Sequence, residues 1–276
     1  MTLSLPLSPQ VFAILSALIE ERTGLHYDSR ERELLADRIT PRALERGFES
    51  LLDYYYFLRY DPDSEAELAL LTETLVVNET YFFRELSALK VVVELFVPRL
   101  LAQGTKPRIW SAACATGEEP LTLAMLLDEA KLLDRVSLLA SDISGRALAH
   151  AQIGHYFRRS LRALPPGVTG RWLQPDENGD GMRVARHITR AIEWRRVNLV
   201  SDAELAALGH FDIVICRNVL IYFRDRTIER VIANLWQSLT TDGHLLVGAS
   251  ESLLRFDASF ACEEQRGAFF YRKLPK

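Results

Sequence analysis

R-I-W-S-A-A-C-A-T-G-E-E-P, at residues 108–120, is the stretch from which the fold of this 276-residue chain can be worked out. It begins as a short apolar strand after Pro107, passes through small residues, and meets a helix predicted over Leu121–Ala130. A second strand is predicted at Val136–Ala140. A strand, a helix and a strand in succession indicate a βαβ unit, and therefore a parallel sheet covered by helices on both faces.

The same alternation continues toward the C-terminus. Strands predicted at Phe211–Ile215 and His244–Val247 are separated by a helix over Thr227–Leu239, whose apolar residues recur at helical spacing. The apolar run Phe269–Tyr271 is expected to add an antiparallel strand. Residues 81–276 are therefore predicted to form one α/β domain.

A segment of about residues 157–192 interrupts this alternation. It contains the turn residues Pro165-Pro166-Gly167 and, further on, Asn-Gly and Asp-Gly pairs between Trp172-Leu173 and Met182–Val184. Such pairs between two short apolar runs indicate a β-hairpin. We predict a small inserted β subdomain, with an irregular surface loop as the alternative.

Residues 1–80 predict a separate helical domain. Ser8-Pro9 places an N-cap before a proline at the first helical position, and Gly24 fits the end of that helix. A second helix passes through Leu34–Ile39, and Pro41 is expected to kink or end it. Further helices are predicted over Leu51–Leu58, from Asp63-Ser64 onward, and as a connector around 85–103.

The composition excludes several classes of protein. The net charge of −4 and the isoelectric point near 5.9 argue against a general nucleic-acid binder. The three cysteines and six histidines have no metal-ligand spacing, so no metal is expected. The first ten residues lack the pattern of a secretory signal, and no apolar run is long enough for membrane insertion. A cytoplasmic protein with reduced thiols is expected.

Ligands of open parallel sheets bind beyond the carboxyl ends of the strands, and the first motif follows such an end. Residues 111–120 combine small side chains, a single Gly117 and two adjacent acids, Glu118 and Glu119. A dinucleotide-binding loop relies on several glycines to admit a pyrophosphate, and this stretch has only one glycine. S-adenosylmethionine carries no phosphate but has an ammonium group and a sulfonium group, which acids suit. At this point either acid is a candidate contact.

Two further motifs follow strand ends. Asp142 follows the second strand, where a carboxylate can accept both ribose hydroxyls; the alternative is an N-cap for the next helix. The run F-D-I-V-I-C-R-N-V-L-I-Y-F at 211–223 ends a buried strand in Arg217-Asn218 and leads to Tyr222. Tyr222 is either a site residue or an ordinary core aromatic, and the spacing leaves both open.

A fourth cluster, N-E-T-Y-F-F-R at 78–84, lies between the helical and α/β parts. Arg84 beside aromatic residues is suited to hold a carboxylate in a fixed geometry. The alternative is a surface ion pair with packing aromatics.

These motifs together resemble the chemotaxis receptor glutamate methyltransferases, the CheR family. The matching segments run in the family's order and spacing along nearly the whole chain: N-E-T-Y-F-F-R at 78–84, W-S-A-A-C-A-T-G-E-E-P at 110–120, A-S-D-I-S at 140–144, R-V-N-L at 196–199, the run at 211–223, and G-A-S-E-S-L at 248–253. The chain departs from the family's usual residues at Ala113, where Gly is usual, and at Ala249, where His is frequent.

The resemblance implies an α/β fold: a Rossmann-like S-adenosylmethionine-dependent methyltransferase domain with a mostly parallel sheet, an antiparallel C-terminal strand and an inserted β subdomain, plus an N-terminal all-helical domain. It implies transfer of a methyl group to receptor glutamates, with S-adenosylhomocysteine as product and Arg84 and Tyr222 as the catalytic pair. The residues implied to bind the cofactor are Asn78, Thr80, Arg84, Glu118, Asp142, Asn198, Leu199, Arg217 and Asn218.

The implied partner is the cytoplasmic helical region of chemoreceptors. Arg38, Arg42 and Arg46, which we call the arginine stripe, recur every four residues and would face an acidic receptor helix; a solvated face is the alternative. The inserted β subdomain is a second expected contact. We expect a monomer that binds no nucleic acid. A non-catalytic binding module and a methyltransferase for another acid are the rival functions, and a nicotinamide oxidoreductase is disfavoured by the missing glycines.

The cysteines give one expectation that does not come from the resemblance. Cys114 and Cys216 lie near neighbouring strand ends if the first and fourth parallel strands are adjacent. We then expect bound cofactor to shield both thiols from alkylation.

Overall fold

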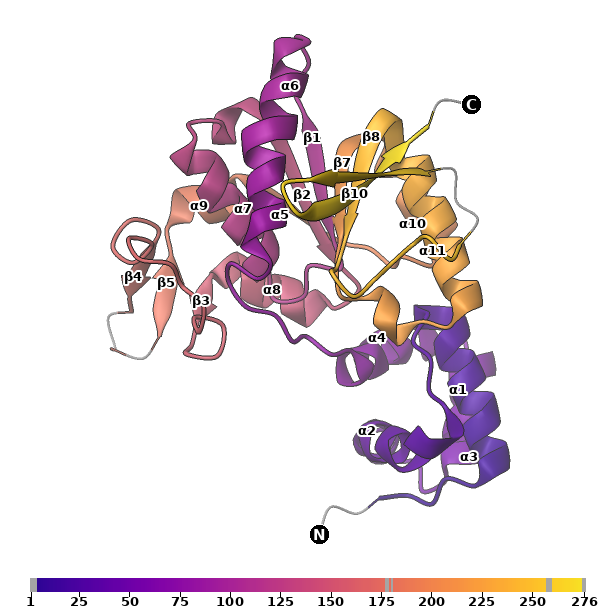
Figure 1. Cartoon of the computed structure of the whole chain (residues 1–276). Helices are drawn as coiled ribbons and strands as arrows, with labels where there is room; N and C mark the ends of the chain where they lie inside the picture. The colour runs from indigo at the N-terminus through magenta and orange to yellow at the C-terminus, as the bar shows by residue number, and fades with distance from the viewer. Residues whose placement is uncertain (1–3, 177–178, 180, 257–259, 275–276) are drawn as a thin grey trace. The chain divides into compact units, whose positions relative to one another are not determined.

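The computed structural model describes residues 4–176, 179, 181–256 and 260–274 (Figure 1). Their contacts divide the chain into two compact units. The helical unit comprises the described residues up to Val77 together with Tyr222–Thr227. The α/β unit comprises Asn78–Ile221 and the described residues from Ile228 onward.

The helical unit is built from four helices: α1 Pro9–Thr23, α2 Arg32–Glu45 after the 3-10 turn η1 Ser29–Glu31, α3 Leu51–Tyr60, and α4 Ser64–Leu75. The predicted limits of α1 are confirmed, because the Ser8 hydroxyl accepts a hydrogen bond from the Val11 amide and Gly24 ends the helix at φ 81°. Leu15, Leu35, Tyr54 and other apolar side chains of the four helices form one buried core.

Pro41 does not end α2, which continues to Glu45. A proline inside a helix leaves the carbonyl four residues earlier without its amide partner. Pro41 and Asp37 are both exposed, so the unpaired carbonyl lies on the solvent side of the helix, where it can be hydrated.

The predicted connector around 85–103 is confirmed as one helical run in three parts: α5 Leu86–Val91, the π-helical segment η2 Val92–Phe96, and α6 Val97–Ala102. Pro98 lies in the first turn of α6 and has no N–H to donate to the residues before it. Val92 and Phe96 are fully buried against the sheet core, together with Ile109 and Ile213.

The main sheet confirms the predicted α/β class. Its strand order is β6-β2-β1-β7-β8-β10-β9, in which the first five are parallel and β10 and β9 are antiparallel (Figure 1). The bounds are β1 Arg108–Ala112, β2 Ser137–Asp142, β6 Ile192–Arg196, β7 Phe211–Cys216, β8 Leu239–Val247, β9 Phe260–Gln265 and β10 Ala268–Lys273. The helices and turns of this unit are α7 Glu118–Glu129, η3 Leu133–Arg135, α8 Gly145–Ile153, α9 Arg186–Arg190, α10 Asp202–Ala206, η4 Leu220–Tyr222 and α11 Asp225–Ser238.

The direction of strand addition reverses between β1 and β7. The chain runs from β1 to β2 and β6 on one side, and then returns to place β7 on the other side of β1. Ala112 at the end of β1 pairs with Ser141 of β2 and with Cys216 of β7. Successive residues Ile109 and Trp110 are both fully buried, as expected for a sheet covered on both faces. This reversal is where ligands of such sheets bind.

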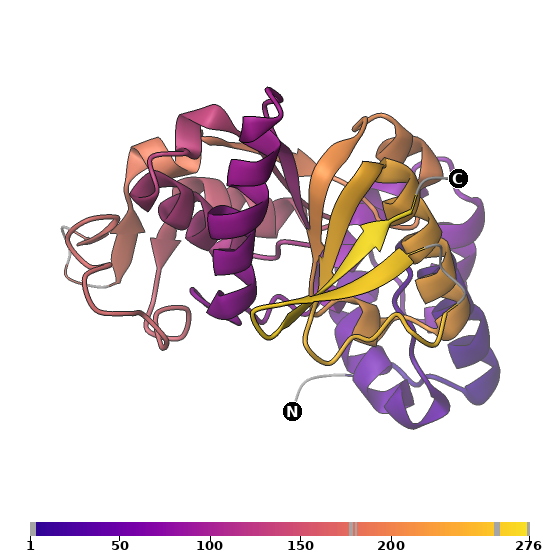
Figure 2. The same cartoon turned by 45° about the horizontal axis from the view of Figure 1, so that its top comes forward.

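The predicted inserted β subdomain is a three-stranded antiparallel sheet, in the order β3-β5-β4, with β3 at His155–Tyr156, β4 at Leu173–Pro175 and β5 at Met182–Val184. The β4–β5 pairing confirms the predicted hairpin; turn residues 177, 178 and 180 lie outside the described residues. The small sheet lies at the end of the α/β unit away from β8 and β10 in both views (Figures 1 and 2).

The edge strand β6 was not predicted. Its sequence, I-E-W-R-R, alternates apolar and charged residues and lacks the continuous apolar run of a central parallel strand. An edge strand has one neighbour and one exposed side, so charged side chains are tolerated there. The strand β9 was also missed, and its exposed residues alternate with half-buried ones in the same way.

Candidate functional site

The loop after β1 adopts a backbone that favours small residues. Ala113, Ala115 and Gly117 all have positive φ, at 53°, 49° and 92°. A Cβ added to Gly117 would meet the Cβ of Ala151 at 2.5 Å, so this glycine is needed for space as well as for conformation. Left-handed non-glycine residues cost about 1–2 kcal/mol each and cluster at functional sites.

Asp142 supports this loop. Its Oδ2 accepts from the Ala115 amide at 2.8 Å, and its Oδ1 accepts from the Ser144 amide at 2.9 Å. The alternative role of Asp142 as an N-cap is wrong, because Ser144 caps α8 through a bond from the Ala147 amide. Asp142 therefore joins the ends of β1 and β2 at the expected binding edge.

Glu118 lies in the first turn of α7 with a buried carboxylate. Its Oε2 accepts from the Thr116 hydroxyl and its Oε1 accepts from the Ser160 hydroxyl, both at 2.7 Å. Burial raises the pKa of Glu118, and the two hydroxyl bonds partly oppose this shift. Ser160 also accepts a backbone bond from the Phe82 amide, so the inserted segment is tied to both the α7 start and the 78–84 cluster.

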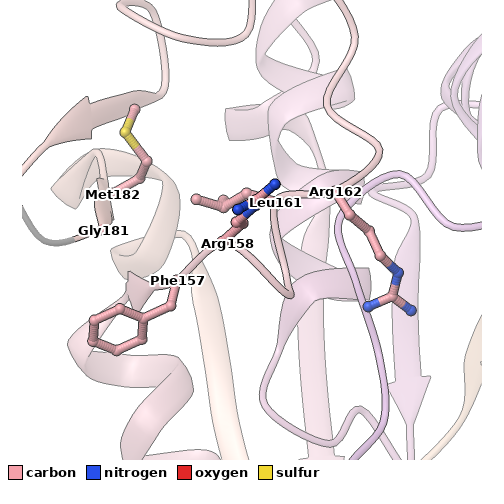
Figure 3. A pocket seen from close by; sticks show the side chains of 6 residues that line it. All are labelled: Phe157, Arg158, Leu161, Arg162, Gly181 and Met182. Carbon is pink, nitrogen blue, oxygen red and sulfur yellow. The ribbon is translucent and has the colours of Figure 1, made fainter.

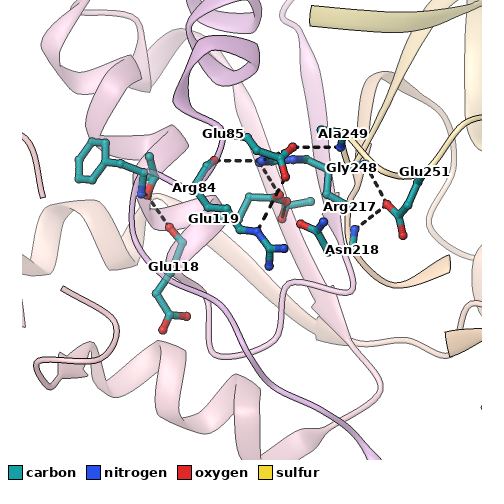
Figure 4. Close-up of polar contacts among 12 residues, drawn as sticks. Arg84, Glu85, Glu118, Glu119, Arg217, Asn218, Gly248, Ala249 and Glu251 are labelled. Carbon is teal, nitrogen blue, oxygen red and sulfur yellow. Dashed lines mark hydrogen bonds and ion pairs between the residues drawn. The ribbon is translucent and has the colours of Figure 1, made fainter. Parts of the chain in front are cut away.

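Glu119 contacts a different set of groups. Its Oε1 accepts from the Ser111 hydroxyl at 2.7 Å, and its Oε2 accepts from Nη1 of Arg217 at 3.0 Å. Burial raises the pKa of Glu119, while the Arg217 charge lowers it in part. The two adjacent acids thus point to different places: Glu118 toward the inserted segment and Glu119 toward β7 (Figure 4).

Arg217, the first residue after β7, is the centre of a buried polar network (Figure 4). Besides Glu119, its Nη2 donates to the Arg84 carbonyl at 2.9 Å and lies 3.0 Å from Oε2 of Glu85. Its side chain is 2% exposed, and its Nε is buried without a hydrogen-bond partner among the described residues. Arg217 therefore fixes the backbone at Arg84 and still has one donor unused.

Arg84 makes long contacts with its side chain. Its Nη1 lies 3.4 Å from the Glu79 carbonyl oxygen, its Nε lies 3.8 Å from Glu85, and its guanidinium is 5.7 Å from the Tyr81 ring centre. The backbone around it is strained, because Phe83 and Glu85 have φ of 62° and 48°. A guanidinium with a fixed backbone and no tight ion pair is suited to receive a carboxylate.

Three of the remaining predicted cofactor residues, Asn198, Leu199 and Asn218, follow strands that end at this edge. Asn198 and Leu199 follow β6, and the preceding Val197 donates its amide to the Asp142 carbonyl at 3.0 Å. Asn198 Oδ1 accepts from the Val200 amide. Asn218 follows Arg217 with φ 59°. Asn78 and Thr80 are half-buried in the irregular segment before α5. Candidate cofactor residues therefore lie at or after the carboxyl ends of β1, β2, β6 and β7.

Tyr222 belongs to the helical unit. Its carbonyl accepts from the His26 amide at 2.9 Å, and Phe223 forms an antiparallel bridge with Leu25. Its side chain is half-buried, so it is not a core aromatic. Its catalytic pairing with Arg84 stays a prediction.

The arginine stripe is not a free basic surface. Arg42 pairs with Glu67, whose side chain is 3% exposed, at 2.6 Å, and Tyr54 donates to the same carboxylate at 2.7 Å. Arg38 Nη1 donates to the Leu75 carbonyl at 2.5 Å. Arg46 is 45% exposed and lies 3.7 Å from Glu67. The expectation that all three arginines face a partner is therefore wrong for Arg38 and Arg42. Both guanidinium groups are bonded to other groups of the helical unit.

A separate pocket of about 650 Å³ lies on the inserted subdomain (Figure 3). It is lined by Phe157, Arg158, Leu161, Arg162, Gly181 and Met182. Arg162 also stacks on Tyr81 at 3.9 Å. The pocket combines apolar walls with arginine, and sequence reasoning had not singled it out.

Within residues 4–176, 179, 181–256 and 260–274, no group of three metal-ligating side chains comes together. No helix in these ranges has the length and apolarity to cross a membrane.

Two functional candidates were missed by the sequence. Glu85 bonds Arg217 and the Ala249 amide, and Glu251 accepts three backbone amides near Asn218. Glu85 directly follows Arg84, and Glu251 lies in the quoted segment 248–253. Their places beside Arg84 and within a segment that matches the family were the available signals.

Comparison with known proteins agrees with this geometry. Residues 78–269 match the model of the CheR methyltransferase SAM binding domain, and residues 10–76 match that of the CheR methyltransferase all-alpha domain. Chemotaxis protein methyltransferase 2 of Vibrio cholerae serotype O1 is 31% identical over 258 residues, covering 92% of this chain and 89% of the relative. Chemotaxis protein methyltransferase 1 of Pseudomonas aeruginosa is 31% identical over 252 residues, covering 88% and 90%.

A third relative, the chemotaxis protein methyltransferase of Borreliella burgdorferi, is 29% identical over 245 residues and covers 86% of each chain. The two domain matches together follow the order of the two parts of the chain and include each strand-end motif described above. The chain belongs to the CheR methyltransferase family.

Proposed function

We propose that this chain transfers the methyl group of S-adenosylmethionine to glutamate side-chain carboxylates of bacterial chemoreceptors, giving glutamate methyl esters for sensory adaptation. The observation that carries the proposal is the Glu119–Arg217–Arg84 network at the strand reversal, which holds the Arg84 backbone and leaves its guanidinium in long contacts. Membership of the family and the names of the relatives support the assignment to chemotaxis.

The residues present fit S-adenosylmethionine. The left-handed turn through Ala113 and Ala115 lets the backbone approach a ligand, and Asp142 supplies a carboxylate for hydroxyl groups. Arg217 places a buried cationic side chain at the same edge, with one donor, Nε, that has no partner among the described residues. We assign cofactor binding to the nine residues named for it above. When bound, the cofactor supplies an electrophilic methyl group on a sulfonium.

The catalytic task of the protein is then positioning. A glutamate side chain has a pKa of about 4.3 and is ionised at neutral pH, so no general base is needed. The protein has to remove water from the carboxylate and align one oxygen, which makes catalysis mainly proximity and desolvation. Arg84 orients the carboxylate, and Tyr222 acts as a hydroxyl donor beside the methyl group.

A weak interaction between the Arg84 guanidinium and the substrate carboxylate suits this positioning role. A tight bidentate ion pair would withdraw electron density from the attacking oxygen and slow the transfer. The Glu79 and Glu85 contacts of Arg84, at 3.4 and 3.8 Å, keep the guanidinium oriented without neutralising it.

The receptor would also contact the inserted subdomain. Its pocket carries Arg158 and Arg162 beside apolar side chains, a surface that suits an acidic amphipathic segment. Within the helical unit we retain Arg46 as a candidate contact, since it is the member of the arginine stripe with an exposed side chain.

The test is transfer of labelled methyl groups from S-adenosylmethionine to receptor-containing membranes, followed by treatment with base. Base-labile label released as methanol is expected, because esters hydrolyse whereas N-methyl groups do not. Arg84→Ala and Tyr222→Phe should each lower turnover at least about 100-fold. Arg30→Ala is the control, since Arg30 is 89% exposed and pairs with Asp28 on the surface. Base-stable label, or near wild-type turnover in both variants, would contradict the proposal.

A further inference from the structure

Glu251 accepts hydrogen bonds from three backbone amides, and Figure 4 shows the two from Asn218 and Gly248. Its Oε2 accepts from Asn218 at 2.6 Å and from Gly248 at 2.8 Å, and its Oε1 accepts from Leu220 at 2.8 Å. The residue is 7% exposed. Three N–H groups aimed at one carboxylate stabilise its buried charge in the way that a helix N-terminus binds an anion.

These bonds connect two turns at the binding edge. Asn218 and Leu220 lie in the turn after β7, and Gly248 lies in the turn after β8. Asn218 has a left-handed backbone at φ 59°, a conformation that needs support from its surroundings. Its amide makes the shortest of the three bonds, so Glu251 is part of that support.

Gly248 passes close to both Glu251 and Asn218 in this arrangement. A Cβ at this position would lie 2.7 Å from Oε2 of Glu251 and 2.7 Å from Nδ2 of Asn218. Real Cβ atoms essentially never approach so closely, so alanine at residue 248 would displace the carboxylate or the turn. The lack of a side chain at Gly248 lets its backbone amide bond Glu251 at this close distance.

We propose that Glu251 is a positioning residue for methyl transfer. It acts through the turn after β7, whose Asn218 is a proposed cofactor contact and whose Leu220 begins the short helix η4 that ends at Tyr222. The inference rests on the proposed function for its effect on turnover, but its effect on the turn and on cofactor affinity can be measured without a receptor.

A carboxylate is needed because both oxygens act as acceptors. In Glu251→Gln one oxygen becomes an NH₂ group, which cannot accept and would face an amide donor of the turn. Leaving one buried N–H unsatisfied costs the free energy of its desolvation. The side chain keeps its size, so the packing around it is preserved.

The experiment compares Glu251→Gln and Gly248→Ala with the wild type and with Glu264→Gln, which removes an exposed carboxylate of β9. Isothermal titration with S-adenosylhomocysteine should give a Kd at least about tenfold weaker in the first two variants and unchanged in the control. Hydrogen exchange should be faster in the peptide covering 217–222, while amides of β1 and β2 keep their protection.

Local loss of protection with weaker cofactor binding in both variants supports the proposal. Unchanged exchange in 217–222 and unchanged Kd in Glu251→Gln overturn it. General loss of protection across β1 and β2 in both variants also overturns it, because Glu251 would then stabilise the fold rather than the turn. If the wild type binds S-adenosylhomocysteine but leaves receptor membranes unlabelled, the proposed substrate fails while the Kd and exchange comparisons still test Glu251.

Discussion

Arg217 and Glu119 form a buried ion pair across the strand reversal, with 3.0 Å between Nη1 and Oε2. Arg217 follows β7 and Glu119 lies in the first turn of α7, so the pair joins segments that are 98 residues apart. The same guanidinium bonds the Arg84 carbonyl. One cation therefore links the start of α7, the end of β7 and the backbone of the proposed catalytic arginine.

Arg217→Ala should destabilise the α/β unit by about 3–5 kcal/mol, because it leaves Glu119 buried without its charge partner. Urea unfolding measures the change. The matched control is Arg230→Ala, which breaks a pair with Asp202 whose side chains are 51% and 67% exposed, and which should cost less than about 1 kcal/mol. Equal effects in the two variants would contradict a buried structural pair.

The stability of Glu118→Gln relative to the wild type should be higher at alkaline pH than at acidic pH. Burial raises the folded-state pKa of Glu118, so the folded state binds the proton more tightly than the unfolded state, whose pKa is near ~4.3. Burying the charged Glu118 carboxylate therefore lowers the stability of the wild type fully at a pH above the folded-state pKa. This loss of stability disappears as the pH falls below the unfolded-state pKa. The Tm of Glu118→Gln relative to wild type should be higher at pH 8 than at pH 4. A difference that does not change with pH, or changes with the opposite sign, contradicts this assignment.

Arg42→Ala should destabilise the helical unit by about 3–5 kcal/mol, since Glu67 would lose the partner of a carboxylate that is 3% exposed. Arg46→Ala should change stability by less than about 1 kcal/mol, because Arg46 is 45% exposed and 3.7 Å from Glu67. Thermal unfolding of both variants distinguishes a bundle residue from a surface residue. If both variants changed stability by less than about 1 kcal/mol, Arg42 would be a surface residue like Arg46, which would contradict its pairing with buried Glu67.

Thiol labelling of the native protein with a water-soluble disulfide reagent at pH 8 should modify Cys262 alone. Burial raises the pKa of Cys114 and of Cys216 well above the usual range, so both remain protonated and inaccessible. This replaces the expectation that cofactor shields the two thiols, since the fold already does. One thiol should react before denaturation and three afterwards; more than one before it would show that the binding edge opens.

The sequence by itself determined the elements and the chemistry of the edge. Ser8-Pro9 and Gly24 give α1 its limits because caps act through neighbouring backbone groups, which are local. The βαβ alternation predicts a parallel sheet because apolar periodicity reports which faces are buried. Asp142 and Arg217-Asn218 were identified because polar residues stand at the carboxyl ends of buried strands: Asp142 is the last residue of β2, and Arg217 directly follows β7.

Only the tertiary structure decided how those charges are paired. Glu118 and Glu119 are neighbours in sequence, yet one bonds Ser160 of the inserted segment and the other bonds Arg217 after β7. The four-residue spacing of Arg38, Arg42 and Arg46 predicts a surface charge at Arg42, whereas in the structure Arg42 pairs with the buried Glu67. Glu251 gained its role from amides 31 and 33 residues away. Long-range pairing depends on strand order and on which side chains share a buried space, and neither has a local signal in the sequence.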